Sequence, residues 1–288
     1  MTKFSTIAVG QATITPIFEA DGGSVIEDSL PMATPEEVQK FDWLKPHYLE
    51  DDGRLKANLQ AMLVQVGGKN ILIDPGVGDD KDLTDIPEWA NMHTDFMKNL
   101  SALCPPEKVD FVLCTHMHCD HVGWNTVLQG DKWQPTFPNA QYIFSETEFN
   151  YWETEPQNEL ADDRAGFAAA VLPVYEAGLA RLVPDDYRVT PEVLLIPTPG
   201  HTPGHVSVLI ESDGEQAVIS GDILHHPCEL ARPEWGTPYD TDPERATKSR
   251  TMLLESFVDT GAIFVGSHFA EPVAGKLVRD GKGYKLVV

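Results

Sequence analysis

Four short apolar runs in this chain are each followed by residue types that commonly bind metal ions. The runs span residues 109–114, 193–197, 217–220 and 262–266, and each reads as a buried strand. Histidines and aspartates follow all four of them. In open α/β sheets, binding sites collect at the carboxyl ends of strands, so these segments are expected to converge at one edge. The pattern therefore predicts an α/β fold built around a metal site.

The first run leads into the sequence CTHMHCDHVGWN, residues 114–125. His116 and His118 alternate, so both can face one ion, whereas the adjacent Asp120 and His121 suit a second ion nearby. Imidazole nitrogens and carboxylate oxygens suit zinc, and also iron or manganese. Because the chain has only ten histidines, this spacing indicates a metal site rather than a chance cluster of polar loop residues.

The other three runs complete a pattern that resembles the metallo-β-lactamase superfamily. They lead to Gly-His at 200–201, Gly-Asp at 221–222 and Ser-His at 267–268, in the order of that family's motifs. The sequence LIDPG at 72–76 is similar to the family's early L-x-D-T-G loop, with Pro75 where threonine is commoner. The resemblance implies a four-layer αββα sandwich of two similar halves, with the site at one edge of the sheets.

The resemblance also implies a ligand set for two divalent ions, zinc first, with iron or manganese as alternatives. One ion would be held by His116, His118 and His201, the other by Asp120, His121 and His268, with Asp222 bridging them. Asp74 would either orient a ligand histidine or cap its own turn. His205 is expected to be structural, and Cys119 to be a packed thiol outside the ligand set.

Two divalent ions at such a site imply a hydrolase. They lower the pKa of a shared water, which gives hydroxide near neutral pH, and one ion can polarise a carbonyl. Asp120 can orient that hydroxide and carry a proton. The first motif and residues 137–152 look most like the branch that holds the N-acyl-homoserine lactonases and related esterases and phosphotriesterases. We therefore expect an enzyme that uses a metal-bridging hydroxide to cleave a lactone or another carboxylic ester.

Two alternatives stay open on this evidence. The same site would suit a phosphotriester or a thioester, and an iron-holding version of this fold can oxidise persulfides as a dioxygenase. One position departs from the best-known lactonases of the branch, in which a tyrosine lies three residues after the bridging aspartate. Here that position is His225, which can donate a hydrogen bond or a proton to the substrate or pack against the ligands. His226 is the alternative donor.

Composition limits the expected partners and location. A net charge of −24 repels phosphate backbones, so a nucleic acid is not expected as a partner. The N-terminus does not resemble a signal peptide, no apolar run approaches the roughly 20 residues of a membrane helix, and the four cysteines show no paired spacing. We therefore expect a cytoplasmic protein that binds a small ester or lactone and has no membrane contact.

The expected organisation is one domain over residues 1–288. Within it, residues 20–60 precede the first family motif and are expected either to pack in the ordinary way or to form a lid or a homodimer contact. Trp124, Trp235 and Phe269 lie beside the ligand motifs, so each is expected either to line the pocket or to lie in the core.

Overall fold

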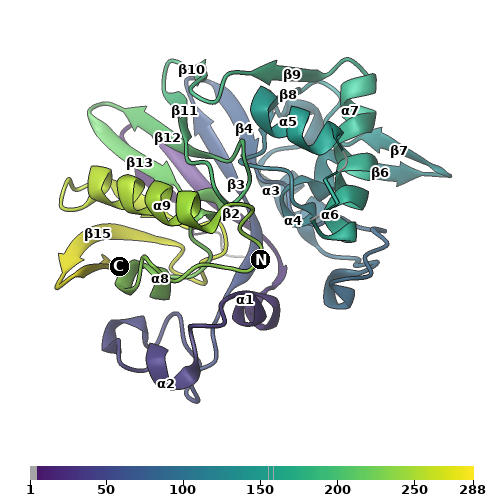
Figure 1. The fold of residues 1–288 in the computed structure, drawn as a ribbon. Coiled ribbons are helices and arrows are strands. Elements are labelled where there is room, and N and C mark those ends of the chain that lie inside the picture. Colours follow the sequence, from purple (N-terminus) through teal and green to yellow (C-terminus); the bar gives the residue numbers. More distant parts are fainter. Residues whose placement is uncertain (1–4, 155, 158) are drawn as a thin grey trace. The chain divides into compact units, whose positions relative to one another are not determined.

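The structure, a computed structural model, describes residues 5–154, 156–157 and 159–288. The chain divides into two compact units. Unit 1 comprises residues 1–20 and 59–185, and unit 2 comprises residues 21–58 and 186–288. Each unit is built on a mixed sheet of seven strands with helices (Figure 1). The α/β fold class expected from the sequence is therefore confirmed.

The sheet of unit 1 has the strand order β1-β2-β3-β4-β5-β8-β9. Gly67 and Gly68 join β3 to β4 with φ angles of 57° and 75°, a left-handed geometry that glycine adopts at little steric cost. β4 and β5 run parallel, so both end at the same edge of this sheet. The strands are β1 Ile7–Val9, β2 Ala12–Asp21, β3 Asn58–Val66, β4 Lys69–Ile73, β5 Phe111–Leu113, β8 Gln141–Ser145 and β9 Ala180–Val183, and β6 Thr126–Gln129 pairs separately with β7 Lys132–Pro135.

The helices of unit 1 bury aromatic side chains against this sheet. Phe96 of α3 (Phe96–Leu103) stacks on Trp124 with ring centroids 5.3 Å apart, and both belong to the unit's hydrophobic core. Trp152 of α5 (Glu146–Glu153) is buried in the same core. Trp124 is therefore a core residue. Short 3-10 turns connect these elements at Pro87–Trp89, Pro106–Lys108 and Gly123–Asn125.

Pro173 lies in a helical segment that runs from Ala161 to Glu176. The segment forms α6 (Ala161–Gly166), a π-helical turn (Phe167–Val171) and α7 (Leu172–Glu176), with Pro173 in the first turn of α7. Proline has no N–H to donate to the carbonyl of Ala169, four residues earlier. That carbonyl instead accepts a hydrogen bond of 2.8 Å from the Thr126 hydroxyl. The helical path therefore continues through a π-helical turn, and a side chain supplies the missing donor.

The sheet of unit 2 has the order β10-β11-β12-β13-β14-β15-β16. Three of the four apolar runs form β11, β13 and β14 here, and the fourth forms β5 of unit 1. β13 and β14 run parallel, so the residues that follow them leave from the same edge. The strands are β10 Arg188–Thr190, β11 Val193–Pro197, β12 Val206–Ser212, β13 Glu215–Ile219, β14 Ile263–Val265, β15 Ala274–Asp280 and β16 Gly283–Val287.

Helix α9 (Pro243–Phe257) lies over this sheet (Figure 1). It starts at a local capping signal, because the Asp242 side chain accepts a hydrogen bond from the N–H of Arg245 and Pro243 occupies the first turn. It ends at Phe257. Its buried face joins the core of unit 2, which also contains Trp235 and Phe269.

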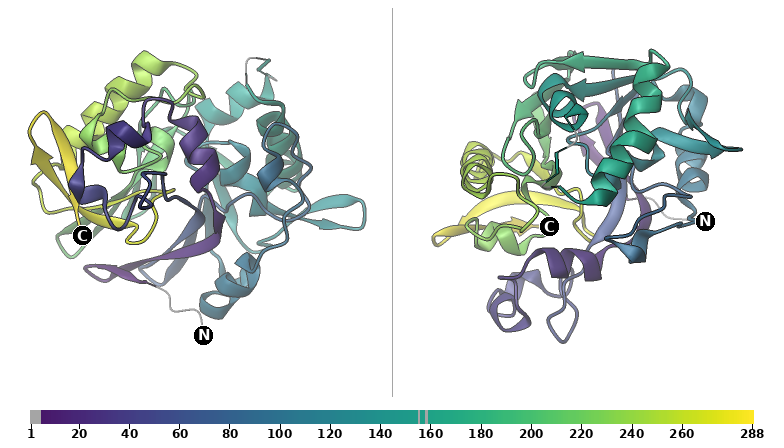
Figure 2. Two further views of the ribbon diagram at one scale, coloured as in Figure 1. Left: turned by 90° about the horizontal axis from the view of Figure 1, so that it is seen from below. Right: turned by 45° about the vertical axis from the view of Figure 1, so that its right-hand side comes forward.

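Residues 21–58 contribute to the core of unit 2. They form α1 (Gly23–Ser29), α2 (Pro35–Val38) and a 3-10 turn at Asp42–Leu44, drawn in purple beside the green and yellow elements of this unit in Figure 2. Helix α2 is short, and Phe41, three residues beyond its end, has non-helical backbone angles and packs edge-on against the Trp235 ring. A role of this segment as a lid or a dimer contact stays a prediction. Among the described residues, every helix is too short or too polar to cross a membrane.

Candidate metal centre

The four candidate metal ligands of unit 1 follow β5 directly. His116 and His118 precede the short helix α4 (Cys119–Val122), which contains Asp120 and His121. The three imidazoles are buried, and the centroid of the His116 ring lies 4.6 Å from that of His118 and 4.1 Å from that of His121. Asp120 is less buried than these histidines. The three histidines of the motif therefore lie against one another, with one carboxylate nearer to solvent.

Asp74 directly follows β4, at the sheet edge where β5 also ends. It contacts His121 of this motif and Thr115 before it. Its backbone has a φ of 50°, and its carboxylate accepts hydrogen bonds from the N–H and hydroxyl of Thr115, at 2.7 and 2.9 Å. Nδ1 of His121 lies 3.1 Å from Asp74 Oδ2. An N–H at this Nδ1 leaves Nε2 as the ring nitrogen that can bind a metal. Asp74 therefore holds the turn and also contacts a histidine, which combines the two roles expected of it.

Two buried acids that the sequence analysis missed hold the backbone of the same loop. Glu148 accepts a hydrogen bond of 3.1 Å from the N–H of Met117, and Asp163 accepts one of 2.9 Å from the N–H of Cys119. Met117 lies between His116 and His118 in the chain, and Cys119 lies between His118 and Asp120. Burial raises the pKa of Asp163, and nearby His118 opposes that shift. Acidic residues on otherwise buried helix faces were the available sequence signal.

The candidate metal ligands of unit 2 follow the ends of three separate strands. His201 follows β11, Asp222 follows β13 and His268 follows β14. Nδ1 of His268 lies 3.0 Å from the carbonyl oxygen of Asn58, to which it can only donate, and Nε2 lies 3.2 Å from Asp222 Oδ2. The N–H of Asp222 donates to Nε2 of His205, at 2.9 Å. His205 thus supports the backbone of Asp222, as its expected structural role requires.

The two adjacent histidines after Asp222 have different surroundings. Nε2 of His226 lies 2.9 Å from the carbonyl oxygen of Tyr48, and its Nδ1 accepts a hydrogen bond of 3.1 Å from the N–H of Cys228. Both ring nitrogens of His226 are therefore engaged by backbone groups. Nε2 of His225 lies 3.4 Å from Asp222 Oδ2, and the His201 ring lies 5.0 Å away from that of His225. Of the pair, His225 is the histidine beside the candidate ligands.

Two further buried carboxylates support this part of unit 2, and the sequence analysis missed both. Asp240 Oδ1 lies 3.0 Å from Nδ1 of His201. Glu229 Oε2 accepts hydrogen bonds from the N–H groups of His225 and His226, at 2.6 and 3.0 Å. Burial raises the pKa of Glu229 to about 7 and also raises that of Asp240, and Arg250 opposes both shifts. Burial likewise lowers the pKa of His225 to about 3, so its neutral ring has one N–H to donate.

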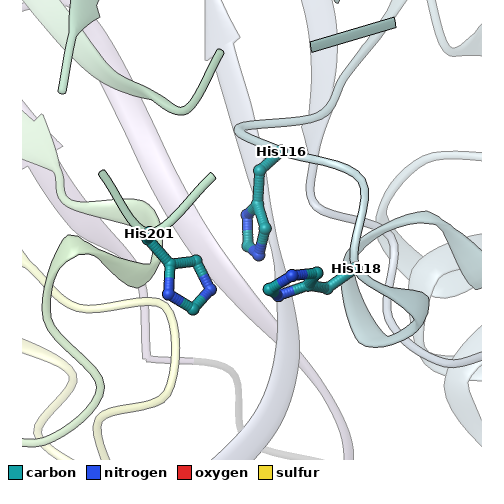
Figure 3. Close-up of side chains that lie close together, drawn as sticks. All are labelled: His116, His118 and His201. Atoms are coloured by element: carbon teal, nitrogen blue, oxygen red, sulfur yellow. The ribbon is translucent and has the colours of Figure 1, made fainter. Parts of the chain in front are cut away.

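Three sets of these side chains have ligand atoms within 4.8 Å of one another. They are His116, His118 and His201; Asp120, His121, Asp222 and His268; and His201, Asp222 and His225. Figure 3 shows the first set, in which His116 and His118 belong to unit 1 and His201 belongs to unit 2. Buried imidazoles and carboxylates without a thiolate suit zinc, iron or manganese. The donors of the first two sets therefore fit two divalent ions.

The sequence and the fold resemble those of proteins in one family. Residues 59–268 match the metallo-β-lactamase superfamily. An N-acyl homoserine lactonase of Bacillus thuringiensis is 30% identical over 152 residues, which cover 52% of each chain. One from Bacillus cereus is 30% identical over 115 residues, 40% of this chain and 38% of the relative. The chain thus matches only about half, or less, of the length of these curated relatives.

Two solved structures share the fold over nearly the whole chain. The hydrolase AbOPH, described as a member of the β-lactamase superfamily, has a TM-score of 0.79 at 26% identity and covers 100% of this chain and 97% of its own. AidC, described as a dizinc quorum-quenching lactonase, has a TM-score of 0.75 at 23% identity and covers 99% and 96%. The resemblance that the sequence motifs indicated is confirmed. This chain belongs to the metallo-β-lactamase superfamily.

Proposed function

We propose that this chain is a metal-dependent hydrolase that cleaves a lactone or another carboxylic ester. The observation that carries the proposal is the pair of donor sets, one of three buried histidines and one of two buried histidines with two carboxylates, of which Asp120 is partly exposed. In this proposal the first ion is held by His116, His118 and His201, the second by Asp120, His121 and His268, and Asp222 contacts both. Zinc is the first choice, because imidazole and carboxylate donors are typical of zinc sites.

The substrate class rests on the relatives. The curated relatives with the names given above are lactonases, and the product-bound AidC structure contains N-hexnoyl-L-homoserine. Because the lactonase matches cover about half of each chain or less, lactone cleavage remains a proposal for this protein. The net charge of −24 supports a small substrate that carries no phosphate backbone.

Two bound divalent ions would supply a water activated near neutral pH and a polarised ester carbonyl. Asp120 is the donor least buried in its set, so it is suited to orient the attacking water and to pass its proton to solvent. Asp240 is hydrogen-bonded to Nδ1 of His201 and would fix the orientation of that ring, and Asp74 lies 3.1 Å from Nδ1 of His121. These contacts would hold the two imidazoles in place before the substrate arrives.

His225 is proposed to donate a hydrogen bond to the substrate oxygen that gains negative charge. It lies beside Asp222 and His201, where a neutral imidazole offers one N–H donor. The rival role is metal binding, because His225 also forms a set of possible ligands with these two residues. His225→Ala separates the roles. Loss of turnover by about 10²- to 10⁴-fold with full metal content supports donation, whereas loss of metal supports ligation.

The function is tested by assaying zinc-loaded protein on lactones, aryl esters, thioesters, phosphotriesters and β-lactams. We expect turnover of a lactone or an aryl ester that chelation abolishes and added zinc restores. A preference for phosphotriesters would support the alternative expected from the sequence. Oxygen uptake by iron-loaded protein with a persulfide would instead indicate the oxidoreductase. Protein that holds zinc and cleaves none of these substrates would contradict the proposal.

A further inference from the structure

Arg250 is a fully buried cation in the middle of α9. Its relative exposure is 0%, and its neighbours on the buried face of the helix are apolar, including Ala246, Leu253 and Leu254. Burying an arginine costs several kcal/mol unless charges and hydrogen-bond acceptors surround it. Such a residue is therefore informative, because its partners must be held in place for it to remain there.

The guanidinium of Arg250 is surrounded by acceptors. Nε donates to the carbonyl oxygen of Ile223 at 2.6 Å, and Nη1 donates to those of Pro233 and Trp235 at 2.9 and 2.5 Å. Nη2 lies 3.4 Å from Glu229 Oε1 and 3.9 Å from Asp240 Oδ2. Nε and Nη1 are therefore hydrogen-bonded, whereas Nη2 faces the two carboxylates at ion-pair distance without a hydrogen bond. A planar guanidinium can reach the three carbonyl oxygens and face both carboxylates at once, and a lysine cannot.

In each carboxylate beside Arg250, one oxygen faces the guanidinium and the other faces a candidate site residue. Asp240 turns Oδ2 toward Arg250 and Oδ1 toward Nδ1 of His201, 3.0 Å away. Glu229 turns Oε1 toward Arg250, while its Oε2 accepts from the N–H groups of His225 and His226. The third contact, to the carbonyl of Ile223, lies one residue beyond Asp222. One side chain therefore reaches the segments of three candidate site residues, His201, Asp222 and His225.

We propose that Arg250 is a positioning residue that sets the orientation of the unit 2 metal ligands, acting through Asp240 on His201 and through the Ile223 carbonyl and Glu229 on the turn that carries Asp222. The inference rests on the proposed metal site. Arg250 touches no candidate ligand directly in the contacts described, so its effect is on how well the ligands are placed. Without the guanidinium, Asp240 and Glu229 keep their ligand-side contacts but lose the positive charge that faces their other oxygens.

The test compares Arg250→Lys with Arg279→Lys. Arg279 is a matched control, because it also pairs with an acidic residue of α9, Glu255, at 2.9 and 2.6 Å. Zinc affinity is measured by competition with a chelating dye on folded protein, and the visible spectrum of the cobalt-loaded protein reports ligand geometry. We expect Arg250→Lys to raise the zinc Kd by about 10- to 100-fold and to change the cobalt spectrum. Arg279→Lys should leave both unchanged.

A folded Arg250→Lys protein with the wild-type zinc Kd and cobalt spectrum would overturn the inference. If Arg250→Lys does not fold, Glu229→Gln provides the same decision, because it removes the charge opposite the guanidinium and keeps the side-chain shape. A raised zinc Kd in Glu229→Gln supports the inference, and an unchanged Kd overturns it. Wild-type protein is loaded first. Failure of the wild type to bind zinc would contradict the proposed function itself, which separates the two failures.

Discussion

Unit 1 and unit 2 assemble their candidate metal ligands in different ways. Unit 1 takes all four from one loop and its short helix after β5, within residues 116–121. Unit 2 takes His201, Asp222 and His268 from the ends of three strands spread over 68 positions of the chain. The first arrangement depends on a local turn, whereas the second depends on the sheet being correctly assembled.

The carboxylates that support these histidines also differ between the two units. In unit 1, Asp74 at the end of the neighbouring strand contacts both Thr115 and His121. In unit 2, the contact from Asp240 to His201 is backed by a buried arginine from α9. We infer that the site residues of unit 2 are the more sensitive to distant changes in packing.

The largest expected effect is on turnover, from Asp120→Ala in unit 1. Loss of this carboxylate removes a ligand and the proposed proton carrier, so ester turnover should fall by about 10²- to 10⁴-fold. Asp131→Ala, at an exposed position between β6 and β7, is the control and should have no effect. Turnover of Asp120→Ala within threefold of wild type would remove this residue from the mechanism.

The next effect compares the two supporting aspartates in metal-free protein. Asp240→Asn leaves Arg250 with one carboxylate fewer, and breaking a buried ion pair typically costs about 3–5 kcal/mol. Asp74→Asn weakens hydrogen bonds to Thr115 and should cost about 1–3 kcal/mol, since asparagine tolerates the positive φ at this position. Urea unfolding measures both. A larger loss of unfolding free energy for Asp74→Asn would reverse the comparison.

A smaller effect should appear in the pH dependence of stability, through His226 of unit 2. Burial lowers its pKa from 6.5 to about 4, so the folded state binds fewer protons than the unfolded state between these values. Its stabilising contribution is complete above pH 6.5 and is lost as the pH falls toward 4, by about 3 kcal/mol in total. His226→Gln should flatten the unfolding free energy over this range. An unchanged slope would contradict the assignment.

Much of the fold could be predicted from local sequence. Gly67 and Gly68 gave the hairpin and Asp242 with Pro243 gave the start of α9, because turns and caps depend on neighbouring residues. The length of α2 could not be predicted in this way. It is set by packing of Phe41 on Trp235, which lies far away in the chain.

Some residues of the candidate site could likewise be predicted from local sequence, and others could not. The spacing of His116, His118, Asp120 and His121 identified the loop of unit 1 without any structure. Asp240 and Glu229 were missed because their neighbours in sequence give no sign of a shared contact. Arg250 did leave a signal, since a charged residue occupies the apolar stripe of Ala246, Leu253 and Phe257 in α9. Its partners became visible only in the folded chain.

The proposed function requires that His116 and His201 bind the same ion, and zinc content tests this directly. We expect about two zinc ions per chain in the wild type and about one in His116→Ala, in His201→Ala and in the double variant, because ligands of one ion are not lost additively. Elemental analysis of loaded and desalted protein gives the numbers. A double variant that retains almost no zinc while each single variant keeps about one ion would place the two histidines in separate sites and contradict the account.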